Sequence, residues 1–185
     1  MLQKQNVTKK FEDIKDVKAL LKASFPPSEQ APMGFLISQA KRDYIEFNAY
    51  YDGDLLSGFA YLIIDEDIVF VLYLAVEGSH RSKGYGSQIL KHIRDEHPDK
   101  RIVLGVEAED ESAQNNDQRK RRKEFYLRNG YSSTGLIFVM RGVDFEILSC
   151  NGGCTAADVL HMNKKFLGAI VFTFFKPKLK KDASL

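Results

Sequence analysis

The chain has 185 residues, 44% of them hydrophobic, and its 27 basic and 25 acidic residues give a formal net charge of +2 at pH 7. A chain of this length can bury the core of one domain without the metal or disulfide staples that smaller domains need. The balanced charge gives no bulk electrostatic sign of a nucleic-acid partner. Residues 1–10 lack the apolar core of a signal peptide, and no apolar run reaches the ~18 residues of a membrane span. We therefore expect a cytoplasmic protein without a membrane partner.

The metal-ligating residue types are scattered. Cys150 and Cys154 are the only cysteines, and no second pair completes a zinc site, so we expect free thiols. The four histidines, at positions 80, 92, 97 and 161, do not show metal-ligand spacing, and His92 and His97 lie five residues apart on opposite sides of an expected helix. The sequence therefore predicts no metal site.

The first half of the chain alternates helical and strand patterns. Pro26 and Pro27 end the first amphipathic helix, and Asp52-Gly53 is a hairpin signal between two strands. The expected elements are a short strand around Val7, helices over 12–24 and 33–41, and strands over 44–51 and 55–65.

A strand expected over 68–76 is apolar on both faces, as is typical of a central strand. It is followed by Arg81-Ser82-Lys83-Gly84-Tyr85-Gly86, a basic, glycine-spaced turn that opens a helix over 84–96. Backbone N–H groups at a helix N-terminus favour a phosphate, and the glycines let the backbone approach it closely. Neither a Walker A loop nor the dinucleotide fingerprint fits, because Tyr85 follows Gly84 and position 89 is Ile. The turn therefore predicts a site for a diphosphate-bearing cofactor.

The second half continues with a strand over 101–107, so that strand, crossover helix and strand imply a locally parallel unit. Gly130 is expected to end a strongly charged helix, and Thr155 with Asp158 forms a capping box. The remaining elements are expected as a helix over 115–129, strands over 131–141 and 145–148, a helix from Thr155 to Phe166, an apolar strand over 169–175 and a basic tail over 176–181.

Two regions of the sequence resemble the GNAT superfamily of acetyl-CoA-dependent N-acetyltransferases. The first is the strand end Leu74-Ala75-Val76 with the loop pattern R/Q-x-x-G-x-G/A, and the second is Glu124-Phe125-Tyr126-Leu127-Arg128-Asn129-Gly130-Tyr131. Two ordered signatures about 40 residues apart are much more specific than a lone glycine motif. The resemblance implies an α/β (α+β) fold with a mixed central sheet and flanking helices. Since the sequence shows no internal repeat or low-complexity linker, we expect a single domain over 1–185, with a core over about 5–142 and a C-terminal helix-strand elaboration over 143–185.

The resemblance implies transfer of an acetyl group from acetyl-CoA to a primary amine of a small molecule or peptide, by direct attack of the amine. In this family, the pantetheine arm bonds strand backbone atoms between two splayed strands. The cofactor-binding residues so implied are Leu74, Ala75, Val76, Arg81, Ser82, Lys83, Gly84, Tyr85, Gly86 and Ser87.

Three further residues are assigned through the same resemblance. Tyr126 matches the tyrosine that protonates the departing thiolate in many family members, although a core aromatic would look the same in sequence. Glu107 lies where a carboxylate often takes the amine proton through water, and the alternative is a solvated strand-end carboxylate. Glu29 lies where the family builds its acceptor pocket, and the alternative is a loop or cap residue.

One departure from the family lies in the basic cluster Arg119-Lys120-Arg121-Arg122-Lys123, which replaces an Asn and a small residue upstream of the tyrosine. The cluster is interpreted either as a solvated helix face or as a contact to phosphates or an acidic acceptor. A non-catalytic module that binds nucleic acid through this cluster and the tail is an alternative, weakened by the few interleaved aromatics. An acyltransferase with another acyl-CoA is a second alternative. The sequence leaves a homodimer open.

Overall fold

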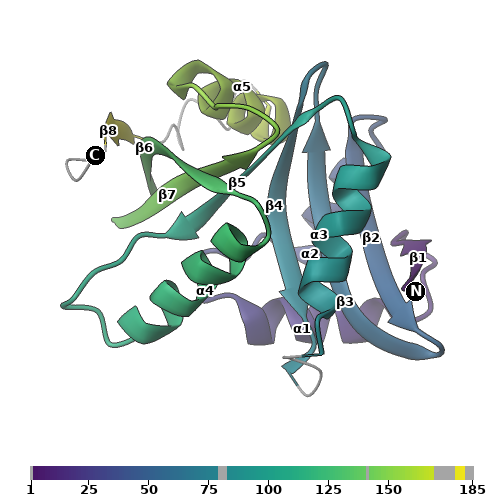
Figure 1. The fold of residues 1–185 in the computed structure, drawn as a ribbon. Coiled ribbons are helices and arrows are strands. Elements are labelled where there is room, and N and C mark those ends of the chain that lie inside the picture. Colours follow the sequence, from purple (N-terminus) through teal and green to yellow (C-terminus); the bar gives the residue numbers. More distant parts are fainter. Residues whose placement is uncertain (1, 79–82, 141, 169–177, 182–185) are drawn as a thin grey trace. The chain divides into compact units, whose positions relative to one another are not determined.

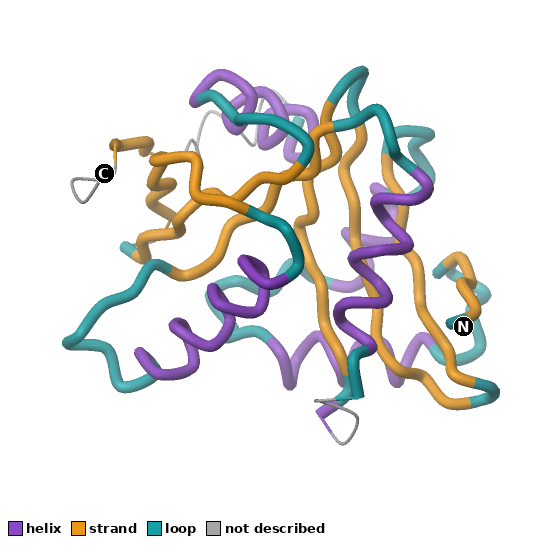
Figure 2. Tube along the Cα trace, viewed as in Figure 1, coloured by secondary structure: helices purple, strands orange, loops and turns teal. Residues whose placement is uncertain are grey.

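The computed structural model describes residues 2–78, 83–140, 142–168 and 178–181 (Figure 1). Within these ranges the backbone forms both strands and helices, shown by type in Figure 2. In chain order they are β1 (Gln3–Asn6), α1 (Ile14–Ser24), α2 (Met33–Gln39), β2 (Ile45–Asp52), β3 (Leu55–Ile64), β4 (Ile68–Val76), α3 (Tyr85–Glu96), β5 (Arg101–Glu107), α4 (Asn116–Arg128), β6 (Ser132–Met140), β7 (Val143–Cys150), α5 (Ala156–Leu167) and β8 (Lys178–Lys181).

The strands follow the order β1-β2-β3-β4-β5-β7-β6-β8 in an eight-stranded sheet. The chain divides into two compact units. The first unit comprises Met1–Ile64 and Val71–Pro98, and the second comprises Asp65–Phe70 and Asp99–Leu185. The mixed α/β fold expected from the sequence is confirmed, and β4 and β5 have the predicted bounds.

The first unit is built on the antiparallel hairpin of β2 and β3, whose register runs from Ile45↔Ile63 to Asp52↔Leu55. Gly53 adopts a φ of 61° in the turn, a conformation that glycine reaches without steric cost, so the predicted hairpin is confirmed. In Figure 1, α3 lies in front of these strands and α1 lies behind them. The apolar faces of both helices are buried, through Val17, Leu20 and Leu21 of α1 and Ile89, Leu90 and Ile93 of α3.

The second unit places β7 between β5 and β6, antiparallel to both. This strand is longer than the expected 145–148, because Gly142, with a φ of 81°, allows a tight turn that starts the pairing at Met140↔Val143. The prediction of a basic tail is wrong for Lys178–Lys181, which pairs antiparallel with β6 as β8. Backbone pairing and the ion pair of Lys180 with Asp144 stabilise this short strand despite its charge. The apolar strand expected over 169–175 lies outside the described residues.

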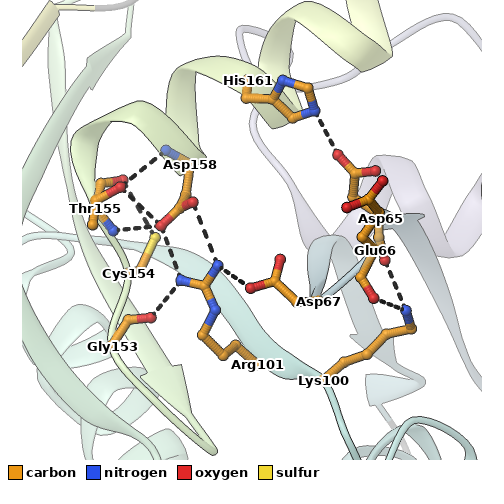
Figure 3. A network of polar contacts seen from close by, with 10 residues as sticks. All are labelled: Asp65, Glu66, Asp67, Lys100, Arg101, Gly153, Cys154, Thr155, Asp158 and His161. Carbon is orange, nitrogen blue, oxygen red and sulfur yellow. Dashed lines mark hydrogen bonds and ion pairs between the residues drawn. The ribbon is translucent and has the colours of Figure 1, made fainter.

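Helix α5 is fixed in the second unit by the polar network of Figure 3. The predicted capping box is confirmed, since Thr155 and Asp158 exchange hydrogen bonds between side chain and backbone. Arg101 donates from Nη1 to Asp158 Oδ2 at 2.9 Å and from Nη2 to Asp67 Oδ2 at 2.8 Å. The hydrogen bond from Arg101 lowers the pKa of the Asp158 carboxyl to about 2. The network therefore connects α5 to β5 and to the turn before β4.

Candidate active site

The predicted anion site begins where β4 leads into α3. Gly84 is the N-cap of α3 and has a φ of 79°, the left-handed region that explains the need for glycine at this position. Gly84 offers no side-chain cap, and the helix starts at Tyr85, one residue after the predicted start. Lys83 is exposed beside this N-terminus. Arg81 and Ser82 lie outside the described residues.

The side chain of Tyr85 has a structural role within the first unit. It is 9% exposed, and its hydroxyl donates to Asp52 Oδ2 at 2.5 Å. This hydrogen bond ties the first turn of α3 to the end of β2. Any contact of Tyr85 with a diphosphate is therefore expected from its backbone N–H and not from its phenol.

At the end of β4, the contacts made within the first unit lie on one edge of the strand, the edge that faces β3. Glu77 donates its N–H to the carbonyl of Ser57 at 3.0 Å, and a Cβ on Gly58 would lie 2.4 Å from the Ala75 carbonyl oxygen. Alternate residues of a strand direct their N–H and C=O groups to opposite edges. Since Ala75 and Glu77 face β3, the opposite edge receives the backbone groups of Leu74 and Val76.

Tyr73 positions the loop that carries Glu29. Its hydroxyl donates to the Glu29 carbonyl at 2.6 Å and accepts from the Ala31 N–H at 3.0 Å. The ring of Tyr73 also packs edge-on against Phe25, with 4.9 Å between centroids. These contacts hold the loop between α1 and α2 next to the end of β4. Sequence reasoning missed Tyr73, because a tyrosine in an apolar strand reads as core.

In the second unit, Tyr126 lies in the last turn of α4 and is 8% exposed. Its ring packs edge-on against Phe125 at 5.1 Å and Tyr131 at 5.7 Å between centroids. Burial raises the pKa of the Tyr126 phenol to about 12, and the nearby charge of Arg122 opposes this shift. Tyr126 therefore keeps its proton throughout the physiological pH range.

Glu107 ends β5 and is 7% exposed. Arg122 Nη1 donates to its Oε2 at 2.9 Å, and Arg119 Nη2 lies 3.2 Å from its Oε1. Asn115 Nδ2 makes a longer contact of 3.4 Å to the same Oε1. Both oxygens of the Glu107 carboxylate are therefore engaged by side chains of α4 or of its N-cap residue. The prediction that Glu107 is solvated is excluded by its burial.

The basic cluster of α4 is thus split by its contacts. Arg119 and Arg122 bind Glu107, and Lys123 Nζ lies 2.8 Å from the buried carboxylate of Glu146. Lys120 and Arg121 are exposed. The interpretation of the whole cluster as a solvated face is therefore wrong for the three paired residues. The sequence signal that could have predicted this pairing was Glu107 at the end of a buried strand, because a buried carboxylate needs a cationic partner.

The structure also tests the expectations about thiols and histidines. Both cysteines are free, Cys150 buried and Cys154 partly exposed, as predicted. The histidines are not all isolated, because His97 lies in a group with Glu46 and Glu96 whose ligand atoms are within 4.8 Å of one another. Spacing along the chain missed this group, since Glu46 comes from a distant strand. Among the described residues, no helix has the length and apolar character to cross a membrane.

Comparison with known proteins finds one family model and several solved structures that are similar to this chain. Residues 43–133 match the family model described as acetyltransferase (GNAT) domain. No curated protein matches the sequence significantly. Among solved structures, a Bacteroides thetaiotaomicron protein assigned to the GNAT acetyltransferases is 23% identical, with a TM-score of 0.69 over 95% of this chain and 99% of that one.

Two other similar structures contain coenzyme A or an analogue. An aminoglycoside 6'-N-acetyltransferase complexed with coenzyme A is 16% identical, with a TM-score of 0.63 over 80% of this chain and 95% of its own. Naa50 of Arabidopsis thaliana, in complex with the bisubstrate analogue CoA-Ac-MVNAL, is 20% identical, with a TM-score of 0.61 over 82% of this chain and 99% of its own. The family match, the fold and both sequence signatures agree, so residues 43–133 are assigned to the acetyltransferase (GNAT) domain family.

Proposed function

We propose that the protein transfers an acetyl group from acetyl-CoA to a primary amine of a small molecule or peptide. The observation that carries this proposal is the junction of β4 and α3, where Gly84 precedes a helix N-terminus that has no side-chain cap. The similar proteins bind coenzyme A or a bisubstrate analogue made from it, which supports the same cosubstrate here.

Acetyl-CoA supplies an activated acetyl thioester, and the protein's residues bind it and manage protons. The described residues of the loop, from Lys83 to Ser87, would hold the diphosphate through backbone N–H groups and the charge of Lys83. Arg81 and Ser82 are assigned to the same site by the family signature. The backbone groups of Leu74 and Val76 are suited to the pantetheine amides, because they point to the edge of β4 that β3 does not occupy.

Tyr126 is the proposed general acid. When the amine nitrogen bonds to the acetyl carbon and the carbon–sulfur bond breaks, the leaving sulfur takes up a proton. The phenol of Tyr126 holds this proton at every pH at which the enzyme would operate, because its pKa is about 12. The packing of its ring against Phe125 and Tyr131 also restricts the orientation of the phenol.

The acceptor side of the proposal rests on Glu29, whose loop is fastened by Tyr73. A carboxylate at this place would attract a protonated amine from solution. The role of Glu107 as general base stays a prediction. Its ion pairs with Arg119 and Arg122 favour a role in positioning those side chains. By binding Arg122, Glu107 holds that guanidinium one helical turn before Tyr126.

The decisive experiment is a panel of primary amines, offered with acetyl-CoA while the release of free thiol is followed. Turnover of small polyamines, aminoglycosides or peptide N-termini would identify the acceptor class. Propionyl-CoA and succinyl-CoA in parallel would test the acyl preference. Absence of turnover with every amine, together with no saturable acetyl-CoA binding by calorimetry, would refute the proposal.

A further inference from the structure

A group of potential metal ligands lies at the C-terminal end of α3, within the first unit. Glu46 comes from β2, Glu96 is the last residue of α3, and His97 is its C-cap. One ligand atom from each lies within 4.8 Å of the other two. The predicted anion site is at the opposite end of the same helix, about 18 Å away for a helix of 12 residues.

The group forms because one face of β2 lies against α3. Glu46, Asn48 and Tyr50 alternate along β2 and so point to the same face. Tyr50 packs edge-on against His92, with 5.6 Å between ring centroids, which places this face under α3. Glu96 follows His92 by one helical turn and lies on the same side of the helix.

His97 directs an unsatisfied nitrogen into this group. Its side chain is 10% exposed, and Nε2 lies 3.4 Å from Glu46 Oε1 without hydrogen-bond geometry. Nε2 is fully buried and has no hydrogen-bond partner. A buried polar atom of this kind costs free energy unless a ligand or water satisfies it.

The spacing and chemistry of the group match a tetrahedral metal site. Ligand atoms bound at the usual zinc distances lie about 3.4 Å apart in a tetrahedron. This is the separation of His97 Nε2 from Glu46 Oε1, and His92 Nε2 lies 3.3 Å from Glu96 Oε1. Imidazole with carboxylate selects zinc-like ions over Mg²⁺ or Ca²⁺, which prefer oxygen ligands alone.

We propose that Glu46, Glu96 and His97 bind a divalent transition-metal ion of the zinc type, with His92 within reach as a further ligand. The ion would fasten the end of α3 to β2, at a distance from the acetyl-transfer site. Lys4 now pairs with Glu96 and supplies a positive charge at that carboxylate. Lys4 therefore competes with the metal, and removing its charge should tighten metal binding.

The test uses the full chain, stripped of metal with a chelator and titrated with Co²⁺ and then Zn²⁺. We expect one Co²⁺ per chain with visible absorption bands of a tetrahedral site, displacement of Co²⁺ by Zn²⁺, and a higher melting temperature. Glu46→Gln and His97→Gln should lose the saturable binding, and Lys4→Gln should strengthen it. Asp95→Asn is the matched control, since Asp95 lies on the same helix, exposed and paired only with Lys91 among the contacts of the described residues.

The variant Cys154→Ser distinguishes metal binding at the proposed site from metal binding at a cysteine thiol. Binding that is lost in Cys154→Ser, or bands of thiolate coordination to Co²⁺, would overturn the proposal. It would equally be overturned if the folded wild-type chain showed no saturable Co²⁺ binding, or if Glu46→Gln bound Co²⁺ as tightly as Asp95→Asn. Glu46 is partly exposed, with 29% of its side chain accessible, so this variant can be judged even where His97→Gln fails to fold.

Discussion

Arg122 donates from Nη1 to Glu107 Oε2 at 2.9 Å, one helical turn before Tyr126 on α4. This ion pair joins Glu107, at the end of β5, to the helical turn that precedes Tyr126. The charge of Arg122 also opposes the effect of burial on the pKa of Tyr126. An arginine that departs from the family pattern has therefore become part of the candidate active site.

We predict that Arg122→Gln lowers the free energy of unfolding by about 1–2 kcal/mol, because a buried carboxylate loses a charged hydrogen-bond donor while Arg119 remains. Turnover should fall as well, since Tyr126 loses its neighbouring charge. Urea unfolding and thiol-release kinetics measure the two effects. Arg121→Gln, at an exposed position of the same helix, is the control and should change neither.

Arg121→Gln and Tyr126→Phe together separate the enzyme from a nucleic-acid-binding module. We expect weak affinity for random DNA that disappears at physiological salt. Tight, saturable nucleic-acid binding that is lost in Arg121→Gln and unchanged in Tyr126→Phe would favour the binding module, because affinity would then follow charge and not the acetyl-transfer site.

Tyr126→Phe should slow turnover by about 10²-fold or more with little change in acetyl-CoA affinity, because it removes the proton donor and keeps the packing. Tyr131→Phe removes a hydroxyl from the neighbouring buried ring, 5.7 Å away between centroids, and should retain most of the activity. Steady-state kinetics and calorimetry on both variants are the measurement. Equal activity in the wild type and Tyr126→Phe would assign Tyr126 to packing alone.

The pH profile offers an independent check on Tyr126. With its pKa at about 12, the phenol stays protonated up to pH 10, so this residue should produce no loss of kcat between pH 7 and about 10. Profiles of the wild type and Tyr126→Phe should therefore run parallel over this range. A descending limb near pH 9 that is present only in the wild type would contradict the buried environment described for Tyr126.

Gly84→Ala should weaken acetyl-CoA binding, because a φ of 79° disfavours any residue with a Cβ and the first turn of α3 would rearrange. Gly142→Ala is the matched control, with a φ of 81° and open space around its Cα, and it should lose similar stability without losing affinity. Calorimetric titration of the two folded variants with acetyl-CoA measures the affinity of each. Unchanged affinity in Gly84→Ala would argue against a diphosphate site at this helix.

Asp158→Asn should reduce stability at neutral pH and lose its effect in acid. The pKa of Asp158 is lowered to about 2 in the folded protein, chiefly by Arg101, from an unfolded value near 4. The stabilisation is therefore complete above about pH 5 and is lost as the pH falls towards 2. Unfolding curves from pH 2 to 7 should show the wild type and variant converging in acid. Asp95→Asn, in an exposed pair, should show no such convergence.

Features that depend on neighbours along the chain were predictable. The bounds of β4 and β5, the capping box of α5 and the hairpin at Gly53 agree with expectation, because periodicity and turn chemistry act over a few residues. The helix start was predicted to within one residue, because Gly84, whose left-handed conformation requires glycine, is the N-cap of α3. These local signals were sufficient to indicate the resemblance to the acetyltransferase family.

Contacts between distant segments were not predictable from patterns of this kind. Glu107 looked like a free strand-end carboxylate until packing brought Arg119 and Arg122 to it, and the charged segment Lys178–Lys181 became a strand only by pairing with β6. His97 meets Glu46 for the same reason. Periodicity records which face of an element is buried, whereas the partner on that face depends on how the elements pack, and only the tertiary structure contains that information.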